Sequence, residues 1–79
     1  MLKEKGLYTV VTFPNTTSAL AMEAACKEAS IPGSIIPVPN QITAGCGFAW
    51  RADAGARERI EGFLAERELT FSQVYTIEL

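Results

Sequence analysis

A chain of 79 residues is too short to build a second hydrophobic core, so we expect one domain over residues 1–79. The net charge of −2 and the scattered lysines and arginines argue against binding to nucleic acid, which requires clustered cations. No apolar run approaches the ~20 residues of a membrane-spanning helix, and the N-terminal segment has no apolar signal region, so we expect a cytosolic protein with no membrane association.

Residues 7–13 predict a buried strand, because they are rich in aromatic and β-branched residues and stop at Pro14. Residues 19–29 predict a helix, because strong helix formers fill them. Its apolar face is made of small side chains and includes Cys26, which we interpret as a packing residue. Glu23 and Lys27 have the spacing of an ion pair on the outer side of this helix.

Residues 34–39 predict a second strand, and its two prolines favour an edge position because proline cannot donate a ladder hydrogen bond. Residues 40–47 form the connection to the next strand. Residues 48–52 predict a third strand, in which Phe48 and Trp50 share one face.

Asp53 has the position of an N-cap for a second helix. The core-facing stripe of that helix consists of Ala56, Ile60, Phe63 and Leu64. Residues 72–79 predict a last strand, whose apolar residues are not perfectly in phase. This irregular alternation favours a bulge or a frayed end.

The order strand–helix–strand–strand–helix–strand predicts an α+β fold, the ferredoxin-like βαββαβ sandwich. In that fold two helices cover one face of a four-stranded antiparallel sheet and leave the other face free. A homodimer through the open sheet face is therefore one expectation. The aromatic residues that we consider for this face are Tyr8, Phe13, Trp50 and Tyr75.

The cysteine and histidine content limits the chemistry. Cys26 and Cys46 are not a CxxC pair, and we do not expect a structural disulfide in a chain without an export signal. Histidine is absent, which removes Cys–His and Ser–His catalytic pairs and most zinc sites. We expect no metal and no cofactor, and a self-sufficient hydrolase is disfavoured.

Cys46 is the strongest candidate for chemistry. Gly45 and Gly47 flank it, and glycines adopt positive φ angles and let a ligand approach the backbone closely. Successive N–H groups in such a turn form an anion-binding nest, and Arg51 is the nearest cation along the chain. Both would favour the thiolate, which is the nucleophilic form. The competing interpretation is a cysteine that packs as a small apolar residue.

Three segments of the chain resemble the selenium/sulfur (Se/S) carrier protein-like family of small bacterial proteins. The most specific of them contain Ile36-Pro37-Val38-Pro39 and Ile42-Thr43-Ala44-Gly45-Cys46-Gly47-Phe48-Ala49; the third begins at Phe13-Pro14. The resemblance implies that Cys46 carries sulfane sulfur or selenium as a persulfide or selenopersulfide. It also implies a donor, either a cysteine desulfurase or a sulfurtransferase, and an acceptor enzyme. In this family the residue before Cys-Gly is serine as often as glycine. Gly45 is a mild departure from that pattern, because it cannot supply the hydroxyl group that serine would.

Two alternatives stay open beside a carrier that is not itself an enzyme. One is a dimeric small-ligand-binding or regulatory module whose cysteine does no covalent chemistry. The other is a structural partner of a larger enzyme.

Overall fold

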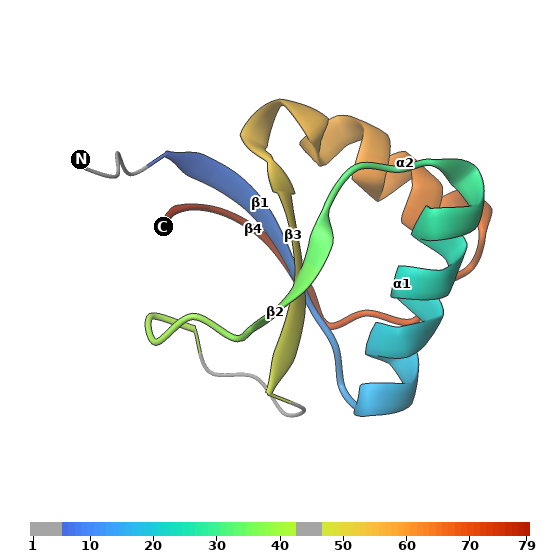
Figure 1. Ribbon diagram of the computed structural model, residues 1–79, viewed down its shortest axis with the longest axis horizontal. Coiled ribbons are helices and arrows are strands. Elements are labelled where there is room, and N and C mark those ends of the chain that lie inside the picture. Colours follow the sequence, from blue (N-terminus) through green and yellow to red (C-terminus); the bar gives the residue numbers. More distant parts are fainter. Residues whose placement is uncertain (1–5, 43–46) are drawn as a thin grey trace.

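The computed structural model describes residues 6–42 and 47–79. Four strands and two helices follow one another in the order β1, α1, β2, β3, α2, β4 (Figure 1). Their bounds are Leu7–Thr12 for β1, Thr16–Ala29 for α1, Ser34–Pro37 for β2, Phe48–Asp53 for β3, Arg57–Glu66 for α2 and Gln73–Glu78 for β4. No helix in these two ranges is long and apolar enough to cross a membrane.

The four strands form one antiparallel sheet in the order β2-β3-β1-β4. The predicted α+β, ferredoxin-like βαββαβ fold is therefore confirmed, as is the edge position of the proline-containing β2. This strand ends at Pro37, two residues earlier than predicted. Residues 38 and 39 belong to the connection that leads to β3.

Both helices pack on one face of the sheet (Figure 1). The core between helices and sheet contains Met22 and Cys26 from α1 and the predicted stripe residues Ile60, Phe63 and Leu64 from α2. The strands contribute Val11, Trp50 and Ala52 to the same core, and Phe13, directly after β1, joins them. Of the four aromatic residues considered for the open face, Phe13 and Trp50 instead face the helices, whereas Tyr8 and Tyr75 do lie on that opposite face.

The second face of the sheet is not bare. The connection after β2 crosses it and places Ile42 against Val10 and Ala49, which are fully buried. The side-chain amide of Gln41 donates to the backbone oxygen of Glu78 on β4, at 3.2 Å. This segment therefore runs from the edge strand β2 to the opposite edge strand and covers the middle of the face.

α1 begins earlier than its sequence pattern indicates, because Asn15 caps it. The Asn15 side chain accepts a hydrogen bond from the backbone N–H of Ser18 at 2.8 Å. The helix ends at Ala29, and the C-cap residue Ser30 has a left-handed conformation with φ of 58°. Glu23 and Lys27 do not form the expected ion pair; within the described ranges the pairs are Arg57–Glu61 and Arg67–Glu28.

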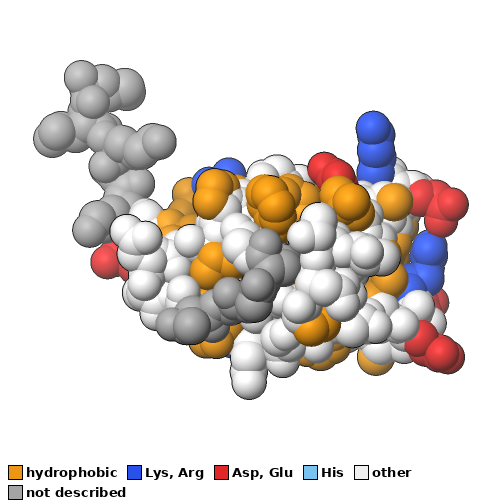
Figure 2. All heavy atoms as spheres, turned by 90° about the horizontal axis from the view of Figure 1, so that it is seen from below, with side chains coloured by type: hydrophobic (Ala, Val, Ile, Leu, Met, Phe, Trp, Pro, Cys, Tyr) orange, Lys and Arg blue, Asp and Glu red, His pale blue; other side chains and the backbone are white. Residues whose placement is uncertain are grey.

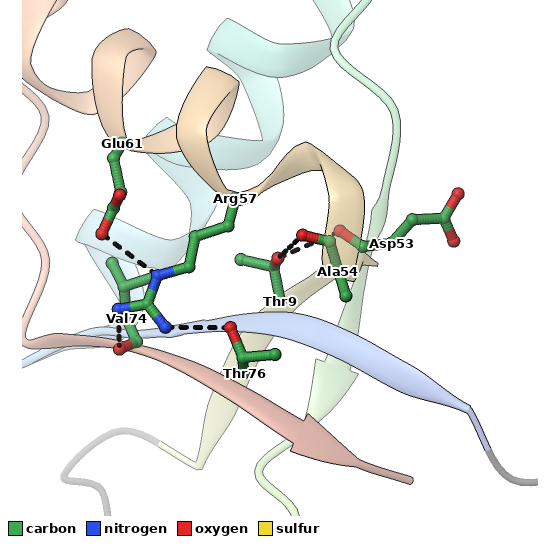
Figure 3. A network of polar contacts seen from close by, with 7 residues as sticks. All are labelled: Thr9, Asp53, Ala54, Arg57, Glu61, Val74 and Thr76. Atoms are coloured by element: carbon green, nitrogen blue, oxygen red, sulfur yellow. Dashed lines mark hydrogen bonds and ion pairs between the residues drawn. The ribbon is translucent and has the colours of Figure 1, made fainter.

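A network around Arg57 joins α2 to β4 (Figure 3). The guanidinium pairs with Glu61 at 3.2 Å and donates to the Thr76 hydroxyl at 2.9 Å and to the Val74 carbonyl at 3.2 Å. Asp53 does not cap α2 with its side chain, because a short 3₁₀ turn, Ala54–Ala56, separates the two. Instead, its backbone carbonyl accepts from the Thr9 hydroxyl at 3.0 Å.

β4 contains no bulge, which corrects the expectation from its irregular apolar pattern. It pairs with β1 without interruption from Leu7↔Glu78 to Thr12↔Gln73. Val74 packs toward the helices, whereas Tyr75 and Ile77 pack on the other face. Apolar residues occur on both sides of this strand because both faces of the sheet are partly covered.

Candidate functional site

The connection between β2 and β3 carries the candidate site, and its described parts are held at both ends. At its base the Val38 N–H donates to the Gly47 carbonyl at 3.0 Å. On the β2 side, the Ile42 N–H donates to the Pro39 carbonyl at 2.9 Å, and the Ile42 side chain is buried on the sheet. Gly45 and Cys46, two of the predicted site residues, lie outside the described residues.

Gly47 is the predicted site residue nearest to Cys46 in the described part of the chain. Its φ is +81°, a value that glycine adopts easily and other residues adopt at a cost. A Cβ built on Gly47 would meet nothing within 4 Å, so backbone conformation rather than crowding requires glycine here. The expectation that a flanking glycine gives the connection a positive φ is met at this position.

Arg51 lies four residues beyond Gly47 in β3, which separates their Cα atoms by about 13 Å at ~3.3 Å per residue. Its guanidinium lies over the ring of Tyr8, 4.9 Å from the centroid. Tyr8 is in register with Asp53, so the guanidinium is near the end of β3 away from Gly47. An effect of Arg51 on Cys46 thus stays a prediction.

Cys26, the other thiol, is a free cysteine with no exposed surface. Burial raises the pKa of its thiol from 9.0 to about 11. Because the thiolate is the nucleophile, this cysteine is unreactive at neutral pH. Its interpretation as a packing residue is confirmed.

The end of the molecule that contains Gly47 is uncharged. β3 and β4 begin there, β1 ends there and α1 starts nearby (Figure 1). Neither residues 31–50 nor residues 69–77 contain Asp, Glu, Lys or Arg. Figure 2 views this end of the molecule, and the charged side chains lie toward the margins of the view.

Two large apolar side chains are exposed at this uncharged end. Phe48, directly after Gly47, is 43% exposed, and Phe71, shortly before β4, is 41% exposed. The backbone of Ser72 is bonded to Thr12 at the end of β1, so the two phenylalanines lie on either side of β1. Neither composition nor periodicity identified this pair, because an exposed aromatic residue is apparent only once the core is known.

Within residues 6–42 and 47–79 no group of three His, Cys, Asp or Glu side chains is arranged to hold a metal ion.

The chain matches a known protein family over most of its length. Residues 8–76 match the family described as "Putative Se/S carrier protein-like". The match includes both helices, the connection that contains Cys46, and the whole sheet except for the outermost residues of β1 and β4. Neither the curated proteins nor the solved structures contain a match to this chain.

Proposed function

Because the chain belongs to the Se/S carrier protein-like family, we propose that it carries sulfane sulfur or selenium on Cys46, as a persulfide or selenopersulfide. The family match, which includes the Cys46 connection, is the observation that carries this proposal. The burial of Cys26 supports it, because that thiol is withdrawn from any partner. The proposed compartment is the cytosol, where thiols persist in reduced form.

The proposed loading step is an exchange between two cysteines. The thiolate sulfur of Cys46 attacks the outer sulfur of a persulfide on the donor enzyme. A new S–S bond forms to Cys46, the donor's S–S bond breaks, and the donor cysteine leaves as a thiolate. No external oxidant is needed, because the sulfane sulfur keeps its oxidation level, and the proton lost by Cys46 passes to the departing thiolate or to water. Delivery to an acceptor thiolate is the same exchange in reverse.

This chemistry suits a chain without histidine. An exchange of this kind needs a thiolate and an approach path for the partner, but no general base in the carrier. Gly47 has a positive φ and no side chain, so it leaves room for a partner beside Cys46. We propose the same role for Gly45. Arg51 is proposed to favour the anion through the field of its charge rather than by contact. If so, Arg51→Gln raises the Cys46 pKa, and the matched exposed variant Arg59→Gln does not.

The uncharged end with Phe48 and Phe71 is the surface that we propose for docking of the donor and the acceptor. A partner of Cys46 is expected to approach the end of the molecule that contains Gly47, and Phe48 and Phe71 are both exposed at that end. The proposed donor is a cysteine desulfurase or a sulfurtransferase that surrounds its own cysteine with uncharged residues. Because no charged pair is involved, we expect loading rates that depend little on ionic strength.

The test is loading by a cysteine desulfurase in the presence of cysteine, followed by the mass of the intact protein. Wild type and Cys26→Ser should each gain the mass of one sulfur atom, and Cys46→Ser should gain none. Equal loading of the two serine variants would refute the proposal, as would an unmodified wild-type protein beside a donor that is itself loaded.

The alternative of a regulatory module without covalent chemistry makes a different prediction for Cys46. A carrier thiol should titrate below the ordinary value of ~8.5, whereas an incidental thiol should titrate near it.

The proposed homodimer through the second sheet face would use the half-buried Tyr75 and Ile77. Sedimentation of wild type and Tyr75→Glu tests it: a dimer that survives this substitution would exclude that face.

A further inference from the structure

A hollow of about 330 Å³ lies at the other end of β3 from Gly47. Tyr8, Pro32, Gly33, Arg51, Ala52 and Asp53 line it. Its volume is near the lower limit of small-molecule sites, which span ~300–1,000 Å³. The hollow shares Arg51 with the proposed carrier site but does not include Gly47, and binding of a ligand in it does not require the proposed function.

Arg51 is the cation of this hollow and is already positioned. The ring of Tyr8 holds its guanidinium at 4.9 Å, and the residue is only partly exposed. Within the described ranges Arg51 forms neither an ion pair nor a side-chain hydrogen bond. Its planar N–H donors therefore remain available, and they match a carboxylate with two parallel hydrogen bonds.

Asp53 is the anion of the same hollow. Its backbone carbonyl is fixed by the Thr9 hydroxyl, and its carboxylate points away from Thr9 and Ala54 (Figure 3). It lies two residues from Arg51 on the same face of β3, about 6.6 Å away by Cα positions. The two opposite charges nevertheless do not pair with each other, as judged over the described part of the chain. A ligand between them can satisfy both.

Gly33 lines the hollow where the segment before β2 packs against β3. Its φ is +135°, and a Cβ there would lie 2.5 Å from the Arg51 backbone oxygen and from the Trp50 Nε1 atom. Glycine thus lets the segment before β2 lie directly against β3. Pro32 and Gly33 form an uncharged wall of the hollow, and Ala52, whose side chain packs in the core on the helix side, borders it.

We propose that this hollow binds a free α-amino acid with an uncharged side chain. The α-carboxylate of this zwitterion would bind Arg51, and its α-ammonium group would bind Asp53. A simple anion would be repelled by Asp53, and a metal cation would be repelled by Arg51. A zwitterion whose ammonium and carboxylate groups are both attached to one carbon meets neither repulsion. The side chain of the amino acid then lies along Tyr8 and the wall at Pro32 and Gly33.

The experiment records amide chemical shifts of the Cys46→Ser variant, so that carrier chemistry cannot contribute. The probes are the uncharged proteinogenic L-amino acids at millimolar concentration. Two derivatives of the amino acid that binds most tightly are then tested. The N-acetyl derivative lacks the ammonium charge, and the matching amine lacks the carboxylate. We expect saturable shifts at Gly33, Ala52 and Asp53, and affinities at least roughly tenfold lower for both derivatives.

Variants locate the site. Arg51→Gln and Asp53→Asn should each weaken binding about tenfold, and the matched surface variant Arg59→Gln should leave it unchanged. Arg51→Lys retains the positive charge but cannot donate two parallel hydrogen bonds to a carboxylate. Its affinity should therefore lie between those of wild type and Arg51→Gln. Well-dispersed spectra establish that each variant is folded. The proposal is overturned if no amino acid shifts these amides, if the N-acetyl derivative binds equally well, or if Arg51→Gln binds like wild type.

Discussion

Gly33→Ala is the substitution whose consequence the structure defines most sharply. Two costs combine at this position. The φ of +135° is one that a residue with a Cβ rarely adopts, and such strain costs ~1–3 kcal/mol. The new Cβ would also lie 2.5 Å from the Arg51 backbone oxygen and from the buried indole nitrogen of Trp50, and overpacking costs ~1–3 kcal/mol more. The free energy of unfolding should therefore fall by about 2–6 kcal/mol.

Urea denaturation measures this loss, and Gly62→Ala is its matched control. Gly62 lies inside α2, where a Cβ would meet nothing within 4 Å, so alanine should stabilise the protein by ~0.5–1 kcal/mol. For a domain of this size, a loss of about 2 kcal/mol lowers the melting temperature by roughly 8–16 °C. If Gly33→Ala unfolds within ~0.5 kcal/mol of wild type, the close contact of the segment before β2 with Trp50 is wrong.

Three further predictions concern the core, the α2–β4 contact and the buried thiol. Phe63→Ala should lower the free energy of unfolding by ~3–5 kcal/mol, because Phe63 is 6% exposed in the main core; a loss below ~1 kcal/mol in urea would contradict that burial. Arg57→Ala should cost about 1 kcal/mol, and Arg57→Lys should not restore it, because a lysine cannot reach Glu61, Thr76 and Val74 together; full rescue by lysine would reduce the network to a simple charge effect. The pKa of Cys26 is raised to about 11 in the folded state from 9.0, so stability should be complete below pH 9 and fall by about 1.4 kcal/mol per pH unit between these values. Cys26→Ala should lack this slope in a pH series of urea titrations, and an identical slope in both proteins would contradict the assignment.

The fold was predictable from sequence because its signals are local. β-branched runs, helix-forming stretches and the stripe of Ile60, Phe63 and Leu64 each report on a single element, and their order then indicates the topology. The start of α1 was less certain, because several polar residues precede it and only the geometry shows that Asn15 is the cap.

The errors concern contacts between distant segments. Phe13 and Trp50 are two of the four candidates for the open face and lie on the helix side instead, because a strand pattern shows which residues share a face but not which face the helices cover. The irregular apolar pattern of β4 suggested a bulge because the coverage of the second face by Ile42 could not be inferred from β4 itself.

In the candidate site, too, local features could be predicted from the sequence, whereas contacts between distant segments could not. The positive φ expected of a glycine beside Cys46 is present at Gly47, and the role of Gly47 in the site stays a prediction. The stacking of Arg51 on Tyr8 depends on the pairing of β1 with β3, between segments far apart in the sequence, so spacing along the chain pointed only to its proximity to Cys46. The hollow beside Gly33 likewise exists only after β2 and β3 have paired.

Cyanolysis of the loaded protein decides whether Cys46 holds the transferred atom. Cyanide attacks the outer sulfur of a persulfide and releases it as thiocyanate, so the assay counts sulfane sulfur without reference to any acceptor. After loading by a desulfurase and removal of the donor, wild type and Cys26→Ala should each release thiocyanate equal to the amount of protein, and Cys46→Ser should release none. Equal release from Cys46→Ser, or none from wild type beside a loaded donor, would show that Cys46 is not the carrier thiol.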